Sequence, residues 1–299
     1  MGDAEPVARA APAAADQSEG IFAALRPRQW TKNLLVFAGL LFAAEFDDPK
    51  RWGQAIAIFV AYCAASSAAY LFNDVRDAPQ DRLHPVKRYR SVASGAFRAD
   101  RALKVSAMLA IVAIAIAARF GWSALALMAG FLALQAAYSL GLKHIVLIDV
   151  MAIAALFVIR AVAGADAVDV RISPWLIVCT ALLALFLALA KRRGELVALG
   201  AEGTRPALDG YSFALVDQLV SIVAACTIVA YSLYTFSARD SSWMMVTIPF
   251  VVFGLFRYLL LMHREELGEE PENVLLSDVP ILATIAAWAV TCAVILGLT

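Results

Sequence analysis

Cysteine is scarce in this chain of 299 residues, which has four, at Cys63, Cys179, Cys226 and Cys292. They lie far apart within apolar stretches, and no CxxC pair or Cys/His spacing typical of a metal site links them. We therefore expect the cysteines to pack in the core, with no disulfide, zinc or haem. A secretory signal is also missing, because residues 1–20 are rich in Ala and Pro and lack a continuous apolar core. We interpret residues 1–20 as a disordered cytoplasmic tail.

The polar composition of a soluble domain is absent as well. Hydrophobic residues make up 62% of the chain and its mean hydropathy is +0.74, whereas soluble domains are roughly 45–50% apolar. Most of its apolar stretches reach the ~17–25 residues that cross a bilayer as a helix. They lie at 33–46, 53–73, 103–119, 122–140, 145–163, 174–190, 214–236, 243–262 and 278–298. The sequence therefore predicts an all-α integral membrane protein, with about nine transmembrane helices in a single domain over residues 21–299.

Positive charge is scarce in one set of loops and plentiful in the alternate set. The loops that share a side with the N-terminus hold most of the 25 Lys and Arg, including those of two long hydrophilic loops, 74–102 and 191–213. Positive residues favour the cytoplasmic side of a membrane. We therefore expect a multi-pass protein of the plasma (inner) membrane whose N-terminus and two long loops are cytoplasmic.

An acidic motif ends the second apolar stretch, where the chain reads YLFNDVRDAPQDRLHPVKRYR. Its pattern is NDxxDxxxD, at Asn73, Asp74, Asp77 and Asp81. On a helix, Asn73 and Asp77 share one face, and we expect Pro79 to end or kink that helix so that Asp81 lies just beyond it. Magnesium is usually held by one or two carboxylates together with substrate phosphates. The motif therefore predicts a magnesium site, although ordinary solvated loop charges paired with Arg76 and Arg82 are the alternative.

Basic residues recur in the other segments of the expected cytoplasmic side. Lys and Arg bind phosphate oxygens, so acidic and basic groups around one pocket would suit a polyphosphate bridged by metal. The alternative is that these residues follow the positive-inside rule and contact anionic lipid headgroups. The candidates for phosphate binding are Lys32, Asn33, Lys87, Arg88, Lys143, Lys191, Arg192 and Arg193.

Two arginines lie within apolar stretches, at Arg160 and Arg257. Arg160 follows Asp149 by eleven residues, about 16 Å along a helix, so the two side chains cannot pair directly. We expect a structural role for Arg160, and Asp149 near the cytoplasmic end could join the site. Arg257 is about two turns from the inner surface and is a weaker candidate for contact with a lipid phosphate.

The order of these motifs resembles the UbiA superfamily of intramembrane prenyltransferases. The resemblance rests on NDxxDxxxD, then DRLHPVKRYRSVASG at 81–95 and YSLGLK at 138–143. It implies transmembrane helices around a central cavity, cytoplasmic cap loops, and magnesium-dependent transfer at a phosphorylated centre. By resemblance, Asn73, Asp77 and Asp81 would bind the metal and Asp74 would assist, so that the aspartates are the catalytic residues. Tyr138 and Lys143 match the family's tyrosine and lysine after the fourth span.

The second aspartate-rich motif that prenyl diphosphate-binding members carry is missing here. Its place is taken by KRRGELVALGAEGTRPALDGYS, with a basic triplet at 191–193, Glu195 and a distant Asp209. This version resembles the decaprenyl-phosphate phosphoribosyltransferase branch, in which a soluble sugar carries the diphosphate and the lipid one phosphate. It implies transfer of 5-phosphoribose from phosphoribosyl diphosphate to polyprenyl phosphate, a step toward lipid-linked arabinose donors for cell-wall arabinan. The expected partners are these two substrates, Mg²⁺ and the bilayer, with no nucleic acid and with homo-oligomerisation left open.

Two other functions are compatible with parts of the sequence. An aromatic or quinone prenyltransferase would share the fold, but the missing second aspartate motif counts against it. In a membrane transporter, Arg160 and Arg257 would line the pathway, but the one-sided acidic motif would have no explanation.

Overall fold

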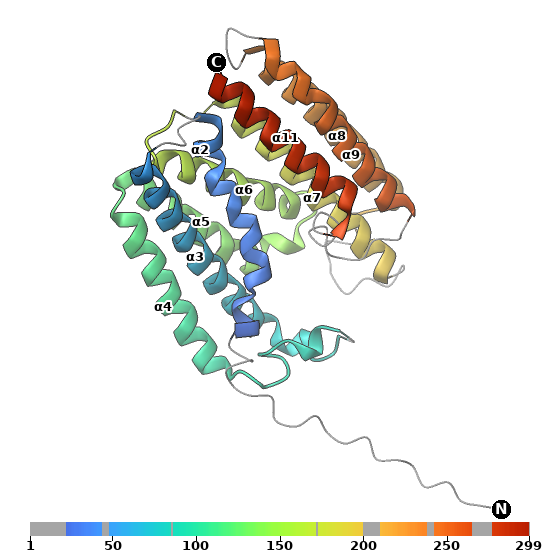
Figure 1. Cartoon of the computed structure of the whole chain (residues 1–299). Coiled ribbons are helices and arrows are strands. Elements are labelled where there is room, and N and C mark those ends of the chain that lie inside the picture. Colours follow the sequence, from blue (N-terminus) through green and yellow to red (C-terminus); the bar gives the residue numbers. More distant parts are fainter. Residues whose placement is uncertain are drawn as a thin grey trace, which may run out of the picture.

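The computed structural model describes residues 22–43, 48–84, 86–171, 173–199, 210–237, 242–264 and 277–298. Within these ranges the chain is almost entirely helical and contains no strand (Figure 1). The long helices are α3 (Pro49–Asp81), α4 (Ala99–Ala118), α5 (Trp122–Leu140), α6 (Ile148–Ala167), α7 (Pro174–Leu199), α8 (Phe213–Ser237), α9 (Ile248–Arg264) and α11 (Val279–Leu298). The shorter elements are η1 (Pro27–Phe37), α2 (Ala38–Ala43), η2 (Lys87–Tyr89), η3 (Leu142–His144) and η5 (Ser242–Thr247).

Seven helical segments of the described residues are long and apolar enough to cross a membrane. They correspond to α3, α4, α5, α6, α8, η5 with α9, and α11. The expected all-α membrane fold is therefore confirmed, but the count of nine is not. The first expected span, 33–46, is formed by the 3₁₀ helix η1 and the six-residue α2 as far as it is described. The expected tail, residues 1–20, and most of 200–213 lie outside the described residues.

The helix α3 is longer than the sequence predicts. Its 33 residues extend about 50 Å at 1.5 Å per residue, more than the ~30 Å hydrocarbon core of a bilayer. Pro79 lies inside α3, so the expectation that it ends the helix is wrong, and Asp81 is the last helical residue rather than a residue of the loop. A proline so close to the end removes one hydrogen bond from a turn that is about to stop. The acidic motif is consequently helical throughout.

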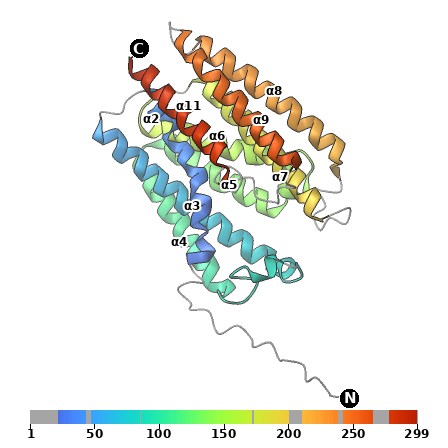
Figure 2. The same cartoon turned by 45° about the vertical axis from the view of Figure 1, so that its right-hand side comes forward.

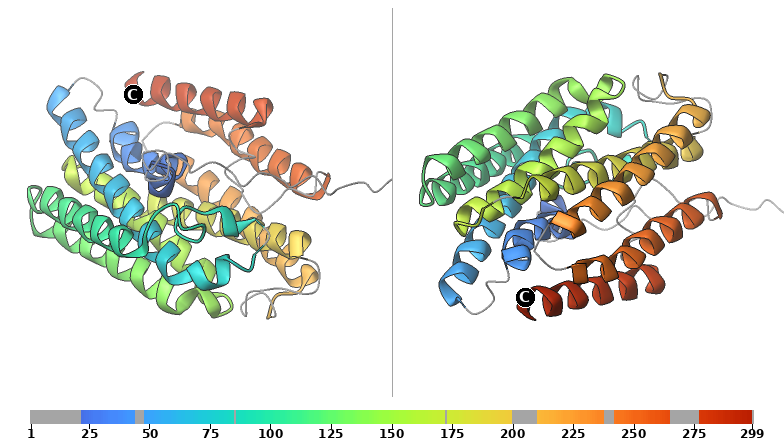
Figure 3. Two further views of the ribbon diagram at one scale, coloured as in Figure 1. Left: turned by 90° about the horizontal axis from the view of Figure 1, so that it is seen from below. Right: turned by 90° about the horizontal axis from the view of Figure 1, so that it is seen from above.

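The helices pack in two groups that share α6. In the first group, η1 and α3 to α6 surround a core in which Tyr62 meets Phe131 edge to face, with ring centroids 5.0 Å apart. In the second group, α6 to α9 and α11 surround a core in which Phe186 meets Tyr258 at 5.2 Å. Figures 1 and 2 show α3, α4 and α5 on one side of the molecule and α8, α9 and α11 on the other. The views along the other axis in Figure 3 show the same division.

Close backbone contact fixes η1 and α2 against α6. A Cβ atom added to Gly164 of α6 would lie 2.0 Å from the carbonyl oxygen of Val36, and one added to Gly39 would lie 2.8 Å from the Cα of Ala165. Only glycine permits such an approach, which is the small-residue packing common between membrane helices. It sets the position of the residues in η1 that face the interior.

Candidate active site

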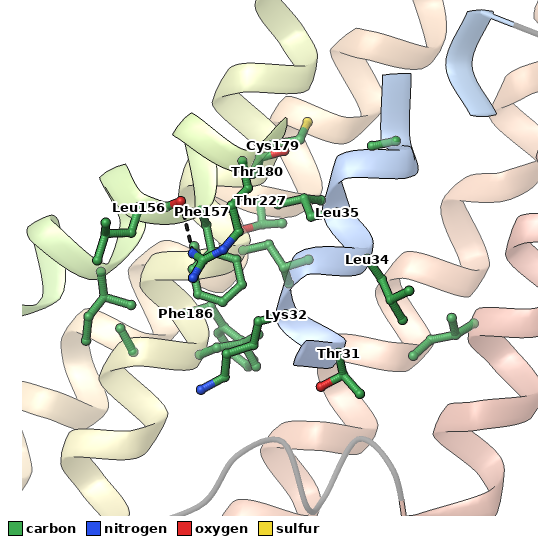
Figure 4. A pocket seen from close by; sticks show the side chains of 18 of the residues that line it. Thr31, Lys32, Leu34, Leu35, Leu156, Phe157, Cys179, Thr180, Phe186 and Thr227 are labelled. Carbon is green, nitrogen blue, oxygen red and sulfur yellow. Dashed lines mark hydrogen bonds between the residues drawn. The ribbon is translucent and has the colours of Figure 1, made fainter. Parts of the chain in front are cut away.

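A cavity of about 1070 Å³ lies between the two groups of helices. Its wall is contributed by η1, α2, α3, α5 to α9 and α11, and most of the side chains that line it are apolar. Lys32 projects from η1 toward the side on which Phe157 of α6 and Phe186 of α7 lie (Figure 4). The polar lining residues that the sequence predicted are Lys32, Asn73, Tyr138, Lys191 and Arg192.

Three of the lining helices bring their C-terminal turns to the same end of the cavity. Figure 1 shows α3 and α4 running in opposite directions, and the short connections between α4, α5, α6 and α7 make these successive helices antiparallel as well. The helices α3, α5 and α7 therefore run in one direction. Tyr138 comes from the last turn of α5, and Asn73 and Lys191 each lie eight residues before the last residue of α3 and α7. The acidic motif, the family tyrosine and the basic triplet are thereby gathered at one end.

Lys143 pairs with the central aspartate of the motif. Its ammonium group lies 2.6 and 2.8 Å from the two carboxylate oxygens of Asp77 and 3.3 Å from the amide oxygen of Asn73. The amide of Asn73 donates to Asp77 at 2.9 Å, across one helical turn. Lys143 itself is only 4% exposed, which makes this pair a shielded one. The structure thus brings the site candidates Asn73, Asp77 and Lys143 together.

The other two aspartates pair with arginines. Arg26 donates to Asp74 at 2.5 Å, and its guanidinium lies 5.0 Å from the centre of the Tyr70 ring. Arg90 donates to Asp81 at 2.8 Å and lies 3.6 Å from Asp74. Each aspartate of the motif thus has a cationic partner within the described residues.

Sequence reasoning did not include Arg26 and Arg90 among the site residues. One structural signal marks Arg26: its φ of 52° lies in the left-handed region, immediately before Pro27. That conformation costs about 1–3 kcal/mol for a non-glycine residue and recurs at functional sites. The strained backbone delivers the guanidinium of Arg26 to Asp74.

Besides Lys143, four of the predicted phosphate-binding residues do not line the cavity. Arg88 is exposed and donates to the hydroxyl of Tyr89 at 2.9 Å, and Lys87 precedes it in η2. Asn33 is fully buried and accepts a hydrogen bond from Arg160 at 2.7 Å. Arg193 donates to Asp217 at 2.6 Å and to the carbonyl of Met262 at 3.0 Å.

Arg192 is buried among acids at the edge of the cavity. Its Nη1 lies 2.6 Å from Oε2 of Glu195 and its Nε lies 3.5 Å from Oδ2 of Asp149, distances suited to ion pairs although these atoms are not aligned for hydrogen bonds. Arg192 is 1% exposed and Asp149 is 0% exposed. Asp149, which the sequence suggested could join the site, therefore belongs to a buried charged cluster around Arg192.

Tyr211 connects this cluster to the segment that carries Lys143. Its hydroxyl donates to Asp149 at 2.8 Å and accepts from the backbone N–H of Leu147 at 2.8 Å. Leu147 has a φ of 67°, an unfavourable value for a leucine. Burial and the neighbouring carboxylate raise the pKa of Tyr211 above its usual value, so the hydroxyl stays protonated. The bond to Leu147 holds the turn between η3 and α6 in its strained form.

The oxygen atoms of the acidic motif fit a magnesium ion by their chemistry. Carboxylate and amide oxygens of α3 are hard ligands, and Mg²⁺ needs only one or two carboxylates when substrate phosphates and water complete its shell. In the described residues, no three His, Cys, Asp or Glu side chains converge as a ready-made metal cage. The aspartates bind Arg26, Arg90 and Lys143 instead. A metal would therefore share or displace these cations.

The chain matches known proteins along most of its length. A model of the UbiA prenyltransferase family matches residues 34–277. Relatives named decaprenyl-phosphate phosphoribosyltransferase include those of Mycolicibacterium smegmatis, 34% identical over 90% of both chains, and of Mycobacterium tuberculosis, 33% identical over 91% of this chain and 92% of the relative. A UbiA homolog from Archaeoglobus fulgidus bound to GPP and Mg²⁺ has a TM-score of 0.71 at 16% identity, covering 94% of this chain and 100% of that one. The chain belongs to the UbiA prenyltransferase family.

Proposed function

We propose that this chain is a magnesium-dependent enzyme that transfers 5-phosphoribose from phosphoribosyl diphosphate to a polyprenyl phosphate and releases diphosphate. One observation carries the proposal: the cavity joins a polar end, beside the acidic motif, to a wall of apolar side chains from most of the helices. An anionic soluble donor and a lipid acceptor could therefore meet in it. The names of the relatives that match over most of both chains support a phosphoribosyl group as the group transferred and a polyprenyl phosphate as the acceptor.

The reaction breaks one bond and forms one. The bond between C1 of the ribose and the diphosphate oxygen breaks, and its electron pair leaves with the diphosphate. An oxygen of the lipid phosphate then bonds to C1, where positive charge has developed. The reaction needs no covalent intermediate with the enzyme, so the protein contributes mainly positioning and charge stabilisation.

The acidic motif is the proposed metal-binding site. Asn73, Asp77 and Asp81, assisted by Asp74, would hold Mg²⁺, and a bound Mg²⁺ neutralises negative charge on a leaving diphosphate. The amide of Asn73 orients the Asp77 carboxylate through its hydrogen bond. Lys143, buried beside both residues, would lie next to the diphosphate as a fixed cation.

The basic residues at the cavity divide into two sets. Lys32, Lys191 and Arg192 line it and are proposed to bind the donor and acceptor phosphates, with Tyr138 beside them. Lys87 and Arg88 stay predictions for donor binding, because η2 follows the acidic motif closely in the sequence. The bonds of Asn33 and Arg193 support positioning roles instead.

The proposed setting is the plasma membrane, with the N-terminus and the polar end of the cavity in the cytoplasm. The distribution of Lys and Arg supports this orientation. A water-soluble donor would then enter from the cytosol while the lipid enters from the bilayer. The transfer would be a step toward lipid-linked arabinose donors for cell-wall arabinan.

The experiment is a transfer assay with purified protein, radiolabelled phosphoribosyl diphosphate and polyprenyl phosphate. We expect labelled lipid in the presence of Mg²⁺ and none in the presence of a chelator. Formation of product from a prenyl diphosphate and an aromatic acid, with no labelled lipid from the sugar donor, would overturn the proposal in favour of an aromatic prenyltransferase. Label formed equally in the presence of the chelator would overturn its magnesium dependence.

A further inference from the structure

Arg160 is a charged residue in the wall of the cavity, far from the end that carries the acidic motif. It is the thirteenth residue of α6, a membrane-spanning helix, and is 3% exposed. It nevertheless lines the cavity. An ionisable residue inside a membrane helix is costly and commonly marks a ligand site.

The contacts of Arg160 position its guanidinium without neutralising it. Its Nε donates to the amide oxygen of Asn33 at 2.7 Å and its Nη1 donates to the carbonyl of Leu156 at 3.0 Å, the bond drawn as a dashed line in Figure 4. The rings of Phe131 and Phe157 lie 4.7 and 5.3 Å from its central carbon. No carboxylate among the described residues lies within ion-pair distance of it.

Other arginines of the long helices differ in this respect. Arg257 of α9 pairs with Asp278 at 2.9 Å, and Arg192 and Arg193 of α7 pair with Glu195 and Asp217. A buried cation without an acidic partner carries an unfavourable desolvation energy that an anionic ligand would offset. Of the five N–H donors of a guanidinium, the hydrogen bonds within the described residues engage Nε and Nη1. The Nη2 group is left for a ligand in the cavity.

The level of Arg160 can be compared with that of the acidic motif along α3. Asn33 also accepts a hydrogen bond from Ser66 of α3 at 3.3 Å, so Arg160 lies near the level of Ser66. Asn73 is seven residues further along α3, about 10 Å at 1.5 Å per residue. A phosphorylated pentose whose diphosphate lay at the acidic motif would extend over a comparable length. The acceptor phosphate that attacks C1 must also lie beyond the diphosphate.

We propose that Arg160, held in place by Asn33, binds a phosphate monoester in the depth of the cavity. The inference rests on the proposed function, which supplies two such groups: the 5-phosphate of the sugar donor and the phosphate of the lipid acceptor. Both present the oxygens that a guanidinium binds in a bidentate manner. Arg160 would thus separate the monoester from the diphosphate, which the acidic motif binds.

The test measures binding rather than turnover, so its outcome does not depend on transfer activity. Affinities of the detergent-purified protein for ribose 5-phosphate, geranyl phosphate and inorganic diphosphate with Mg²⁺ are compared for the wild type and Arg160→Gln. We expect Arg160→Gln to weaken the binding of at least one monoester by about tenfold or more, which corresponds to the loss of one hydrogen bond to a charged group. The affinity for diphosphate should change less than about twofold. A loss of affinity for ribose 5-phosphate assigns the site to the sugar donor, and a loss of affinity for geranyl phosphate assigns it to the lipid acceptor.

Two controls keep the result interpretable. Arg257→Gln removes an arginine of a membrane helix that does not line the cavity, and it should leave all three affinities unchanged. If Arg160→Gln does not fold, Arg160→Lys keeps the charge and should weaken the same monoester by a smaller factor. Unchanged monoester affinities, an equal loss for all three ligands, or no monoester binding by the wild type would overturn the inference. Failure of the proposed function would instead appear as absence of labelled lipid in the transfer assay.

Discussion

The acidic motif of α3 and the basic triplet of α7 are both short charged clusters near one end of the cavity, yet they are organised differently. Asn73, Asp77 and Asp81 are spaced by four residues, which keeps them near one face of the helix. Lys191, Arg192 and Arg193 are consecutive, and successive residues of a helix are rotated by about 100°. The first set is therefore presented on one face, whereas Lys191 and Arg192 line the cavity, Arg192 is also held by buried acids, and Arg193 binds Asp217.

The spacing of charges, rather than their number, thus decides whether a cluster forms one site. A phosphate-binding triplet on a helix would need spacing of three or four residues to present its members to one ligand. In α7, only part of the triplet is available to the cavity, and the rest contributes to the fold.

The largest expected effect comes from removing the centre of the acidic face. Asp77→Ala should reduce turnover at least tenfold, because loss of a metal's charge stabilisation raises the barrier by several kcal/mol. The transfer assay measures this, and Asp100→Ala serves as the control because Asp100 is exposed and bound to Arg98. Retention of more than about a tenth of the wild-type rate by a folded variant would speak against metal ligation.

The second prediction separates the members of the basic triplet by stability. Arg192→Met should destabilise the protein by about 3–5 kcal/mol, because it leaves Asp149 and Glu195 buried without their cation. Arg193→Met should cost less, since its partner Asp217 is more exposed. Thermal unfolding in detergent gives both values. Equal losses of stability would show that the triplet behaves as one unit after all.

The third prediction concerns the packing that places Lys32 opposite α6 and α7. Gly164→Ala should destabilise the protein by about 1–3 kcal/mol and reduce activity, because the new methyl group would meet the Val36 backbone. Gly130→Ala in α5 is the matched control, since a Cβ there meets nothing within 4 Å. Equal melting temperatures for the two variants would contradict the close contact between η1 and α6.

The fourth prediction tests the hydroxyl that joins the two regions. Tyr211→Phe removes the bonds to Asp149 and Leu147 and should destabilise the protein by about 1–3 kcal/mol. Because the turn it holds also carries Lys143, KM for the sugar donor should rise more than kcat falls. A drop in melting temperature with no change in KM would show that Tyr211 supports the fold without positioning Lys143.

The smallest effect is expected at a pair outside both regions. Hydrogen bonding from Arg257 lowers the pKa of Asp278 below its usual value. The contribution of the ionised Asp278 carboxylate to stability is therefore present above the unfolded-state pKa, about 3.9. This contribution is lost as pH falls through the lower folded-state pKa. Asp278→Asn should lower the melting temperature at neutral pH. The difference in melting temperature between the variant and the wild type should become smaller in acid. A difference independent of pH would contradict this.

The features that depend on local spacing could be predicted from the sequence. The helical membrane fold and the shared face of Asn73 and Asp77 follow from apolar run length and helical periodicity, whereas the family follows from the resemblance of the motifs. The fold and the family are confirmed. Helical periodicity also fixes where consecutive basic residues point. The prediction that residues 191–193 bind phosphate as one group overlooks the rotation between neighbouring residues of a helix.

The features that depend on contacts between distant segments could not be predicted. Arg26 and Arg90 reach the acidic motif from separate loops, and no local pattern fixes the direction of a loop side chain. The helix also continues past Pro79 because its last turn tolerates the missing N–H. The hydrogen bond between Arg160 and Asn33 joins residues 127 positions apart, beyond the reach of any periodicity argument.

The most direct test of this account is a structure of the protein with Mg²⁺ and phosphoribosyl diphosphate bound. The account predicts a metal-bound diphosphate at Asn73, Asp77 and Asp81, with Lys143 beside it and with Arg26 or Arg90 released from its aspartate. A diphosphate bound at residues 191–193, with the aspartates still paired to Arg26, Arg90 and Lys143, would contradict it.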